Sequence, residues 1–370
     1  MKIAKIKLFL PLLYVGCVLL FPACKEEAAP KEYDRAALTA NVGTSIILPA
    51  YNNLVSELDR LKQDCNIFRH TPDDSRYVAL SEQFHTTWVA WKACSPFEFG
   101  PAASVSLRSV VNTFPCDTLQ IHNNFNSGTY DLNQVVNLDA RGFPALDFLL
   151  YGLGDQTATI VDRYQNPADS ANLLGYLSAV VADIHSNCTN VANQWNSGYL
   201  TTFNEALGTD VGSSTSMLVN ELNRDLEIIK TAGIGIPLGK QTFDTPLPEK
   251  VEGFYSQSSV ALATAELEAL ELLFEGQKTG SAEGYGLREA LNAVDALYNG
   301  GNLGDAIHGQ FQTAKAALAA IPAPLSEAVV TNRAPVEAAF TEIQKLVILL
   351  KTDMASALSI LITYTDADGD

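Results

Sequence analysis

The stretch Arg141-Gly-Phe-Pro-Ala-Leu-Asp-Phe-Leu-Leu-Tyr-Gly152 places one acidic side chain, Asp147, inside an otherwise apolar run. An isolated buried carboxylate costs several kcal/mol unless a partner neutralises it. In a helix, residues three and four positions from Asp147 would share its face. These residues are Phe143, Pro144, Leu150 and Tyr151. We therefore expect a helix whose carboxylate points into packed structure or into a cleft.

Apolar residues at helical spacing dominate the rest of the chain. The clearest stripes are Tyr51, Leu54, Leu58 and Leu61; Val260, Ala263, Leu267, Leu270 and Phe274; Ile307, Phe311, Ala314, Leu318 and Ile321; and Val336, Phe340, Ile343, Val347 and Leu350. Gly276 follows the second stripe as an expected C-terminal cap, and Pro335 lies at a first-turn position of the fourth. Few runs alternate with period two, so the sequence predicts an all-α fold built from helical bundles.

The N-terminus has the pattern of an export signal. Residues 1–23 combine Lys2, Lys5 and Lys7 with an apolar core that is too short for an ordinary membrane-spanning helix. The following Phe-Pro-Ala-Cys24 resembles a bacterial lipoprotein processing site, so cleavage there would leave a lipidated Cys24. A plain signal peptide cut near Ala23 is the alternative.

The segment after the predicted cleavage site indicates where the protein is attached. Lys25-Glu26-Glu27 resembles the export tag of surface lipoproteins in Bacteroidetes-type bacteria. We expect residues 24–35, rich in alanine, proline and charge, to form a flexible lipid tether. The predicted location is the outer membrane, at the cell surface, with its periplasmic face as the alternative.

The remaining chain is longer than one hydrophobic core usually serves, so two domains are expected. Glycine and proline gather in 232–250 and interrupt two helical regions. The sequence therefore predicts an N-terminal helical bundle at 36–231, a linker at 232–250 and a C-terminal helical bundle at 251–370, each resembling a four-helix bundle.

The charge balance narrows the classes of partner. The formal net charge is −18, and loss of the three signal lysines would make it −21. Such a surface repels phosphate backbones and anionic lipids. We expect no nucleic-acid partner, and we expect membrane attachment to depend on the lipid.

The Arg141–Gly152 stretch resembles the signature of the imelysin-like family, which is Gly-x-His-x-x-Glu followed by an apolar Phe-Leu-Leu-aromatic-Gly tail. Further segments are similar to the family in the expected order. They are Trp88-x-x-Trp91-Lys92, Phe97-Glu-Phe-Gly-Pro101, Val111-Asn-Thr-Phe-Pro-Cys-Asp117, Ile236-Pro-Leu-Gly-Lys240 and Lys351-Thr-Asp353. The resemblance covers nearly the whole mature chain. It implies two related helical bundles with the signature between or beside them, in a peptidase M75-like family of iron-regulated bacterial lipoproteins.

Two positions of the signature depart from the family pattern. Pro144 stands where the family has histidine, and Asp147 stands where it has glutamate. Proline supplies neither a metal ligand nor a general base, and it fits the first turn of a helix. We therefore predict no catalytic residue and no metal ligand here, and a structural carboxylate paired to Arg141, Lys92 or backbone amides.

The resemblance also implies that other polar residues approach the signature. The predicted ligand-binding cleft comprises Glu98, Asn112, Asp117, Arg141, Gly142, Pro144, Asp147 and Lys240. Turn chemistry remains the alternative for Asn112 and Asp117, because both residue types bond their own backbone readily.

Four cysteines remain after the signal and Cys24, and four cysteines allow three pairings. If the family segments build one site, Cys94 and Cys116 meet, which favours a Cys94–Cys116 bridge with Cys65–Cys188 as the remainder. Buried free thiols are the alternative.

Three functional hypotheses follow. The preferred one is a non-catalytic cell-envelope lipoprotein that binds a ligand or partner in iron, haem or other metal acquisition, as the family resemblance implies. Iron, haem or another divalent metal would be the ligand, and the partner would be an outer-membrane uptake protein. The alternatives are an imelysin-type peptidase and a surface interaction or adhesion module.

Overall fold

The computed structural model describes residues 31–166, 168, 170–276 and 284–364. Contacts group Glu32–Asp370 into one compact unit. The predicted signal peptide, the lipidation candidate Cys24 and most of the predicted tether lie outside the described residues.

Helices account for nearly all of the regular structure. The first half of the chain forms α1 (Arg35–Asn41), α2 (Leu48–His70), α3 (Asp74–Lys92), α4 (Pro101–Ser104), α5 (Leu107–Val111), α6 (Thr118–Ser127), α7 (Gly142–Tyr151), α8 (Thr157–Gln165), α9 (Ser170–Gln194) and α10 (Leu200–Glu205). The second half forms α11 (Ser214–Ile228), α12 (Ile236–Leu238), α13 (Ser259–Glu275), α14 (Leu287–Ala293), α15 (Leu303–Ala319), α16 (Leu325–Thr331), α17 (Arg333–Ile348) and α18 (Ala355–Ala357). Shorter 3₁₀ or π turns are η1 (Val42–Ile47), η2 (Ser95–Phe97), η3 (Val135–Asn137), η4 (Trp195–Tyr199), η5 (Ile229–Gly235), η6 (Pro248–Lys250) and η7 (Leu349–Met354).

The described strands, β1 (Leu297–Tyr298) and β2 (Gly301–Asn302), form one short antiparallel hairpin in which Leu297 pairs with Asn302. Asn299 and Gly300 at its turn both have positive φ, the conformation that a two-residue type I′ turn requires. The predicted all-α fold is confirmed.

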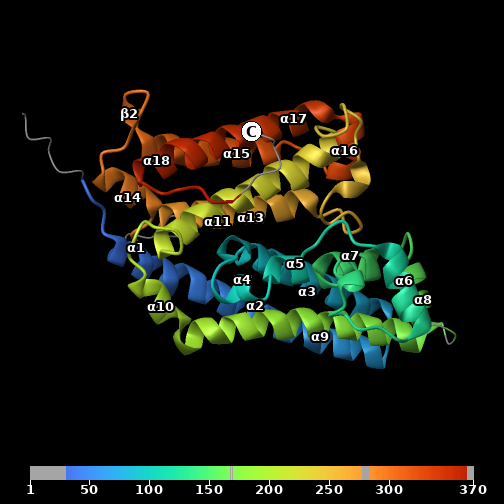
Figure 1. Cartoon of the computed structure of the whole chain (residues 1–370). Coiled ribbons are helices and arrows are strands. Elements are labelled where there is room, and N and C mark those ends of the chain that lie inside the picture. Colours follow the sequence, from blue (N-terminus) through green and yellow to red (C-terminus); the bar gives the residue numbers. More distant parts are fainter. Residues whose placement is uncertain (1–30, 167, 169, 277–283, 365–370) are drawn as a thin grey trace, which may run out of the picture. The chain divides into compact units, whose positions relative to one another are not determined.

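The long helices form two groups, which Figure 1 shows as separate layers. In the first bundle, α2 packs against α3 and α9, and α7 packs against α9. In the second bundle, α15 packs against α13 and α17, and α11 contacts α13 and α17. The two bundles meet where α3 contacts α13 and where η2 contacts α11.

The predicted apolar stripes face these cores. Tyr51, Leu54, Leu58 and Leu61 on α2 have no exposed surface, and Ile307, Phe311 and Ala314 on α15 are likewise fully buried. Helix α13 ends at Gly276, whose φ of 72° is the left-handed cap predicted for this position. The spacing of apolar residues therefore located α2, α13, α15 and α17 correctly, because each of these helices buries the face that carries its stripe.

Helix α11 precedes the predicted linker 232–250 in sequence but packs on the second bundle. The linker itself contains the end of η5, then α12, a turn at Gly239 and η6. The division into independent domains at this linker stays a prediction. In the part of the chain that the structure describes, no helix has the length and apolarity needed to cross a membrane.

Candidate functional site

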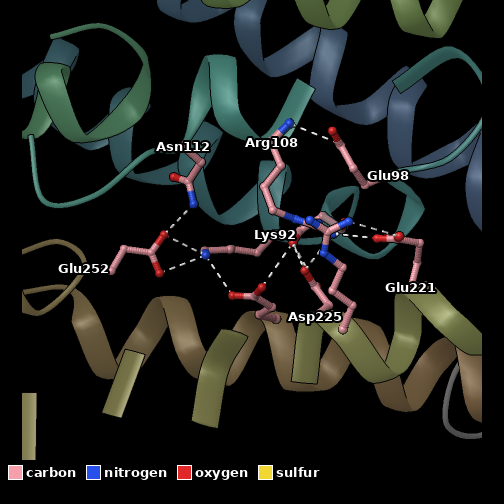
Figure 2. Close-up of polar contacts among 10 residues, drawn as sticks. Lys92, Glu98, Arg108, Asn112, Glu221, Asp225 and Glu252 are labelled. Carbon is pink, nitrogen blue, oxygen red and sulfur yellow. Dashed lines mark hydrogen bonds and ion pairs between the residues drawn. The ribbon is translucent and has the colours of Figure 1, made fainter. Parts of the chain in front are cut away.

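A set of buried and partly buried polar side chains lies between the two bundles (Figure 2). We call this set the buried polar cluster. It consists of Lys92, Ser95, Glu98, Arg108, Asn112, Glu221, Asp225, Glu252 and Glu266. In the first bundle, Lys92 ends α3, Ser95 and Glu98 lie in and just after η2, and Arg108 and Asn112 lie in and just after α5. In the second bundle, Glu221 and Asp225 lie on α11, Glu266 lies on α13, and Glu252 lies in the segment before α13.

One half of the cluster is centred on Lys92, whose ammonium group lies 2.7 Å from both Glu252 Oε1 and Glu266 Oε2. The Asn112 amide donates to Glu252 at 2.7 Å and accepts from the Trp88 indole N–H at 2.9 Å. Burial alone would lower the pKa of Lys92, but the two neighbouring carboxylates raise it above its usual value. Lys92 is therefore a permanent cation that ties α3 to the second bundle.

The other half is centred on Arg108. Its guanidinium donates to the Ser95 carbonyl at 2.8 Å and to Glu221 Oε2 at 3.2 Å, and it lies 3.1 Å from Asp225 Oδ1. The backbone N–H of Arg108 donates to Glu98 at 3.0 Å. Burial raises the pKa of Glu98, and Arg108 opposes this rise.

The hydroxyl of Ser95 joins the two halves. Its oxygen lies 2.7 and 2.8 Å from the two oxygens of Asp225 and 3.0 Å from Glu266 Oε1. A hydroxyl carries one proton, so it cannot donate to two ionised carboxylates at once. Burial and the nearby Glu266 raise the pKa of Asp225 well above its usual value. The raised pKa favours a proton on Asp225, and the Arg108 guanidinium opposes this effect.

The signature helix α7 lies beside the cluster and carries Asp147, which is 2% exposed. Asp147 Oδ2 accepts from the Tyr255 backbone N–H and Oδ1 accepts from the Ser256 backbone N–H, both at 3.0 Å. Burial raises the pKa of Asp147 to about 6, although these hydrogen bonds oppose the rise. Asp147 thus clamps α7 to the segment that leads into α13.

The surroundings of this carboxylate leave little space. Pro144 occupies the first turn of α7 and, with Asp147, Cys116 and Tyr255, lines a cavity of about 30 Å³. That volume accommodates about one water molecule. Pockets for small molecules are typically about 300–1,000 Å³.

The first residue of the signature is Gly142, and its backbone conformation explains why glycine stands there. Its φ is +77°, and a Cβ at this position would lie 2.3 Å from the Val111 carbonyl oxygen. Any side chain would therefore meet both backbone strain and a clash. The close approach holds α7 against the end of α5, next to Asn112.

The structure separates the predicted cleft residues. Glu98 and Asn112 belong to the buried polar cluster, and Gly142, Pro144 and Asp147 lie next to it. Three others lie elsewhere. Asp117 is the exposed N-cap of α6, Arg141 pairs with Asp183 on α9, and exposed Lys240 stands over the Phe340 ring.

Cys65, Cys94, Cys116 and Cys188 are free thiols, so neither predicted bridge is present. Cys65 lies 3.8 Å from the Ser178 hydroxyl rather than bonded to Cys188. Cys116 lines the small cavity beside Asp147, whereas Cys94 is buried in the core, where burial and the nearby Cys188 raise its pKa.

Most acids of the cluster are absent from the cleft predicted from the sequence, although the sequence carries a signal for them. Glu266 lies on the buried side of the α13 stripe, and Asp225 stands between the buried Leu222 and Leu226 of α11. A charged residue within an apolar stripe is the same signal that singled out Asp147. In the described residues, no group of three or more His, Cys, Asp or Glu side chains has a geometry that could hold a metal ion.

The family model described as imelysin, peptidase M75, matches residues 47–352. The chain belongs to the imelysin family. It is 20% identical over 301 residues to iron-regulated protein A of Synechococcus elongatus, covering 79% of this chain and 77% of that protein.

Solved structures share the fold at lower sequence identity. A protein from Parabacteroides distasonis named as an iron-regulated protein A precursor superposes with a TM-score of 0.74, at 18% identity, over 90% of this chain and 97% of that chain. An imelysin-like protein from Psychrobacter arcticum gives a TM-score of 0.63, at 17% identity, over 91% of this chain and all of that chain. The helical architecture of this chain is therefore that of imelysin-like proteins.

Proposed function

We propose that this imelysin-family chain is a non-catalytic cell-envelope lipoprotein that binds a ligand or partner in iron, haem or other metal acquisition. The family membership and the names of its iron-regulated relatives support the iron-related role. The observation that carries the non-catalytic part of the proposal is that the Asp147 carboxylate is buried and hydrogen-bonded to the backbone. Both of its oxygens accept backbone N–H groups.

A carboxylate in this arrangement is poorly placed for catalysis. Two of the acceptor sites of Asp147 are taken by backbone N–H groups, and the side chain is 2% exposed, so little room remains for a metal ion or a water nucleophile. Pro144 beside Asp147 offers no ligand and no proton acceptor. The residues at the signature therefore do not fit a metal centre of the Glu-x-x-His type, and the adjoining cavity of about 30 Å³ is too small for a peptide.

Larger hollows lie away from the signature. One groove of about 630 Å³ follows the second half of α2 and is lined by residues that include Lys62, His70 and Arg76. Another of about 330 Å³ lies between α2, α3 and α13. These volumes are in the range of small-molecule sites, so ligand binding at either place would not require the buried polar cluster.

The lipoprotein part of the proposal rests on the sequence around Cys24. We expect attachment to the outer membrane through a lipid on Cys24, with exposure at the cell surface. Replacing Cys24 by serine should release the protein from the membrane fraction. Retention of Cys24→Ser in washed membranes would contradict lipid anchoring.

The iron-related role is tested by expression and growth. We expect iron starvation to induce the protein and its deletion to slow growth on limiting iron or haem, with recovery when the wild-type chain is restored. Unchanged expression and growth on limiting iron, haem and other metals would refute the acquisition role and favour an adhesion or interaction module.

Direct titration of the purified protein with Fe²⁺, Fe³⁺ and haem identifies the ligand class. Pro144→His is the test variant, because it places a histidine three residues before Asp147, where the family pattern has one. We expect metal binding at the signature in neither the parent nor a Pro144→Ala control. Metal binding by the parent that Asp147→Asn abolishes would contradict the structural role of Asp147.

A further inference from the structure

A group of large aliphatic side chains is exposed around η3. Val135 is 89% exposed, Val136 61% and Leu138 38%, and Leu119 on the adjoining turn of α6 is 69% exposed. Single exposed aliphatic residues are common, but several in one place usually mark an interaction surface. We call these four residues the η3 patch.

The backbone beneath the η3 patch is held firmly. Asn137 is 3% exposed; its amide donates to the Asp131 carbonyl at 2.7 Å and its oxygen accepts from Asn124 at 2.8 Å. The Asp117 backbone N–H donates to the Asp139 carbonyl at 2.8 Å, which places the first turn of α6 against the loop. A surface ordered in this way loses little conformational entropy on binding.

The charged side chains of the segment that carries the η3 patch are all acidic. Residues 109–140 contain three aspartates and no lysine or arginine. Asp117 and Asp131 are exposed and Asp139 is partly exposed. Arg141, which follows directly, is buried and paired with Asp183.

We propose that the η3 patch is a docking surface for a protein partner that presents an apolar pocket rimmed by lysine or arginine. Burial of the valines would supply affinity, and the aspartates would match a basic rim. A second copy of this chain would bring the same aspartates face to face, and an anionic lipid surface would meet the same repulsion. The inference does not depend on the iron-related role.

The test is site-specific photo-crosslinking of the full chain in its own cells. A photo-reactive amino acid replaces Val136, and the control replaces Val330 on α16, a valine that is 54% exposed outside the patch. We expect one discrete adduct with another protein from position 136 and none from position 330. Absence of an adduct, an adduct with a second copy or with lipid alone, or equal adducts at both positions would overturn the proposal.

The partner found in this way is then purified and its Kd for the full chain is measured. Val135→Asn combined with Val136→Asn should weaken binding by at least about tenfold, whereas Val330→Asn should leave it unchanged. Asp131→Asn, which keeps an acceptor for the Asn133 N–H, should weaken binding and reduce its sensitivity to salt. Binding that is indifferent to the valine substitutions or to salt would overturn the proposal, while the growth tests of iron acquisition would be unaffected.

Discussion

Asp147 shows how one side chain can keep a family position while serving a structural purpose. Its carboxylate is buried and receives two backbone N–H groups from residues 255 and 256. Charge-assisted hydrogen bonds of this kind are among the stronger ones in proteins. The carboxylate therefore links two segments that are more than a hundred residues apart in sequence.

Asp147→Asn should lower the free energy of unfolding at pH 7 by about 1–3 kcal/mol. The asparagine oxygen can accept one backbone N–H, but its NH₂ group would face the other as a second donor. Asp117→Asn is the matched control, because asparagine and aspartate cap helices about equally well. Equal stability of the two variants in urea denaturation would contradict the claim that Asp147 stabilises the fold by linking these two segments.

The raised pKa of Asp147 predicts that the stability of the protein depends on pH. Burial raises its pKa to about 6 in the folded state, whereas the unfolded value is about 3.9. The folded state thus binds more protons between these values, so the contribution of this group to stability falls as pH rises through that window, by on the order of 3 kcal/mol. We expect the stability advantage of the wild type over Asp147→Asn to shrink from about pH 4 to about pH 6 and then to level off. An advantage that grows over this window would be inconsistent with the raised pKa.

At the scale of elements, the contact between α5 and α7 depends on Gly142. No other residue type fits its combination of a φ of +77° and a close approach to the Val111 carbonyl. This contact places the start of the signature helix beside Asn112 of the buried polar cluster.

Gly142→Ala should therefore destabilise the protein by about 2 kcal/mol or more, through backbone strain together with the clash. Gly175→Ala on α9 is the control, since a Cβ there meets no atom within 4 Å and alanine favours a helix by roughly 0.5–1 kcal/mol. Thermal unfolding of both variants measures the contrast. A Gly142→Ala protein as stable as the wild type would show that the backbone can move apart.

The helices could be predicted from the sequence because burial of one face leaves a periodic pattern. The stripe from Tyr51 to Leu61 on α2 is the clearest case. The packing of α11 on the second bundle could not be predicted, because an amphipathic helix does not encode which neighbour covers its apolar face. Likewise, Lys92 and Glu252 are 160 positions apart, and nothing local in either segment specifies their contact.

At the scale of the whole molecule, the buried polar cluster joins the two bundles. Four carboxylates, Glu221, Asp225, Glu252 and Glu266, face the two cations Lys92 and Arg108. Such a cluster is sensitive to the loss of any member, because each remaining charge is then buried without its partner.

Lys92→Met should lower the free energy of unfolding by about 3–5 kcal/mol, since Glu252 and Glu266 would lose their cation. Lys345→Met is the control: Lys345 pairs with Glu342 at the surface and is 55% exposed, so its loss should cost less than about 1 kcal/mol. Adding Glu266→Gln to Lys92→Met should restore part of the stability. Equal effects of the two lysine substitutions would show that the cluster does not hold the bundles together.

The central claim is that the signature carboxylate stabilises the fold and does not catalyse a reaction. Cleavage of unfolded insulin chain and the free energy of unfolding can be measured on the same purified samples of wild type and Asp147→Asn. The account predicts no cleavage by either protein and a loss of about 1–3 kcal/mol of stability in the variant. Cleavage by the wild type that disappears in an equally stable Asp147→Asn protein would contradict it.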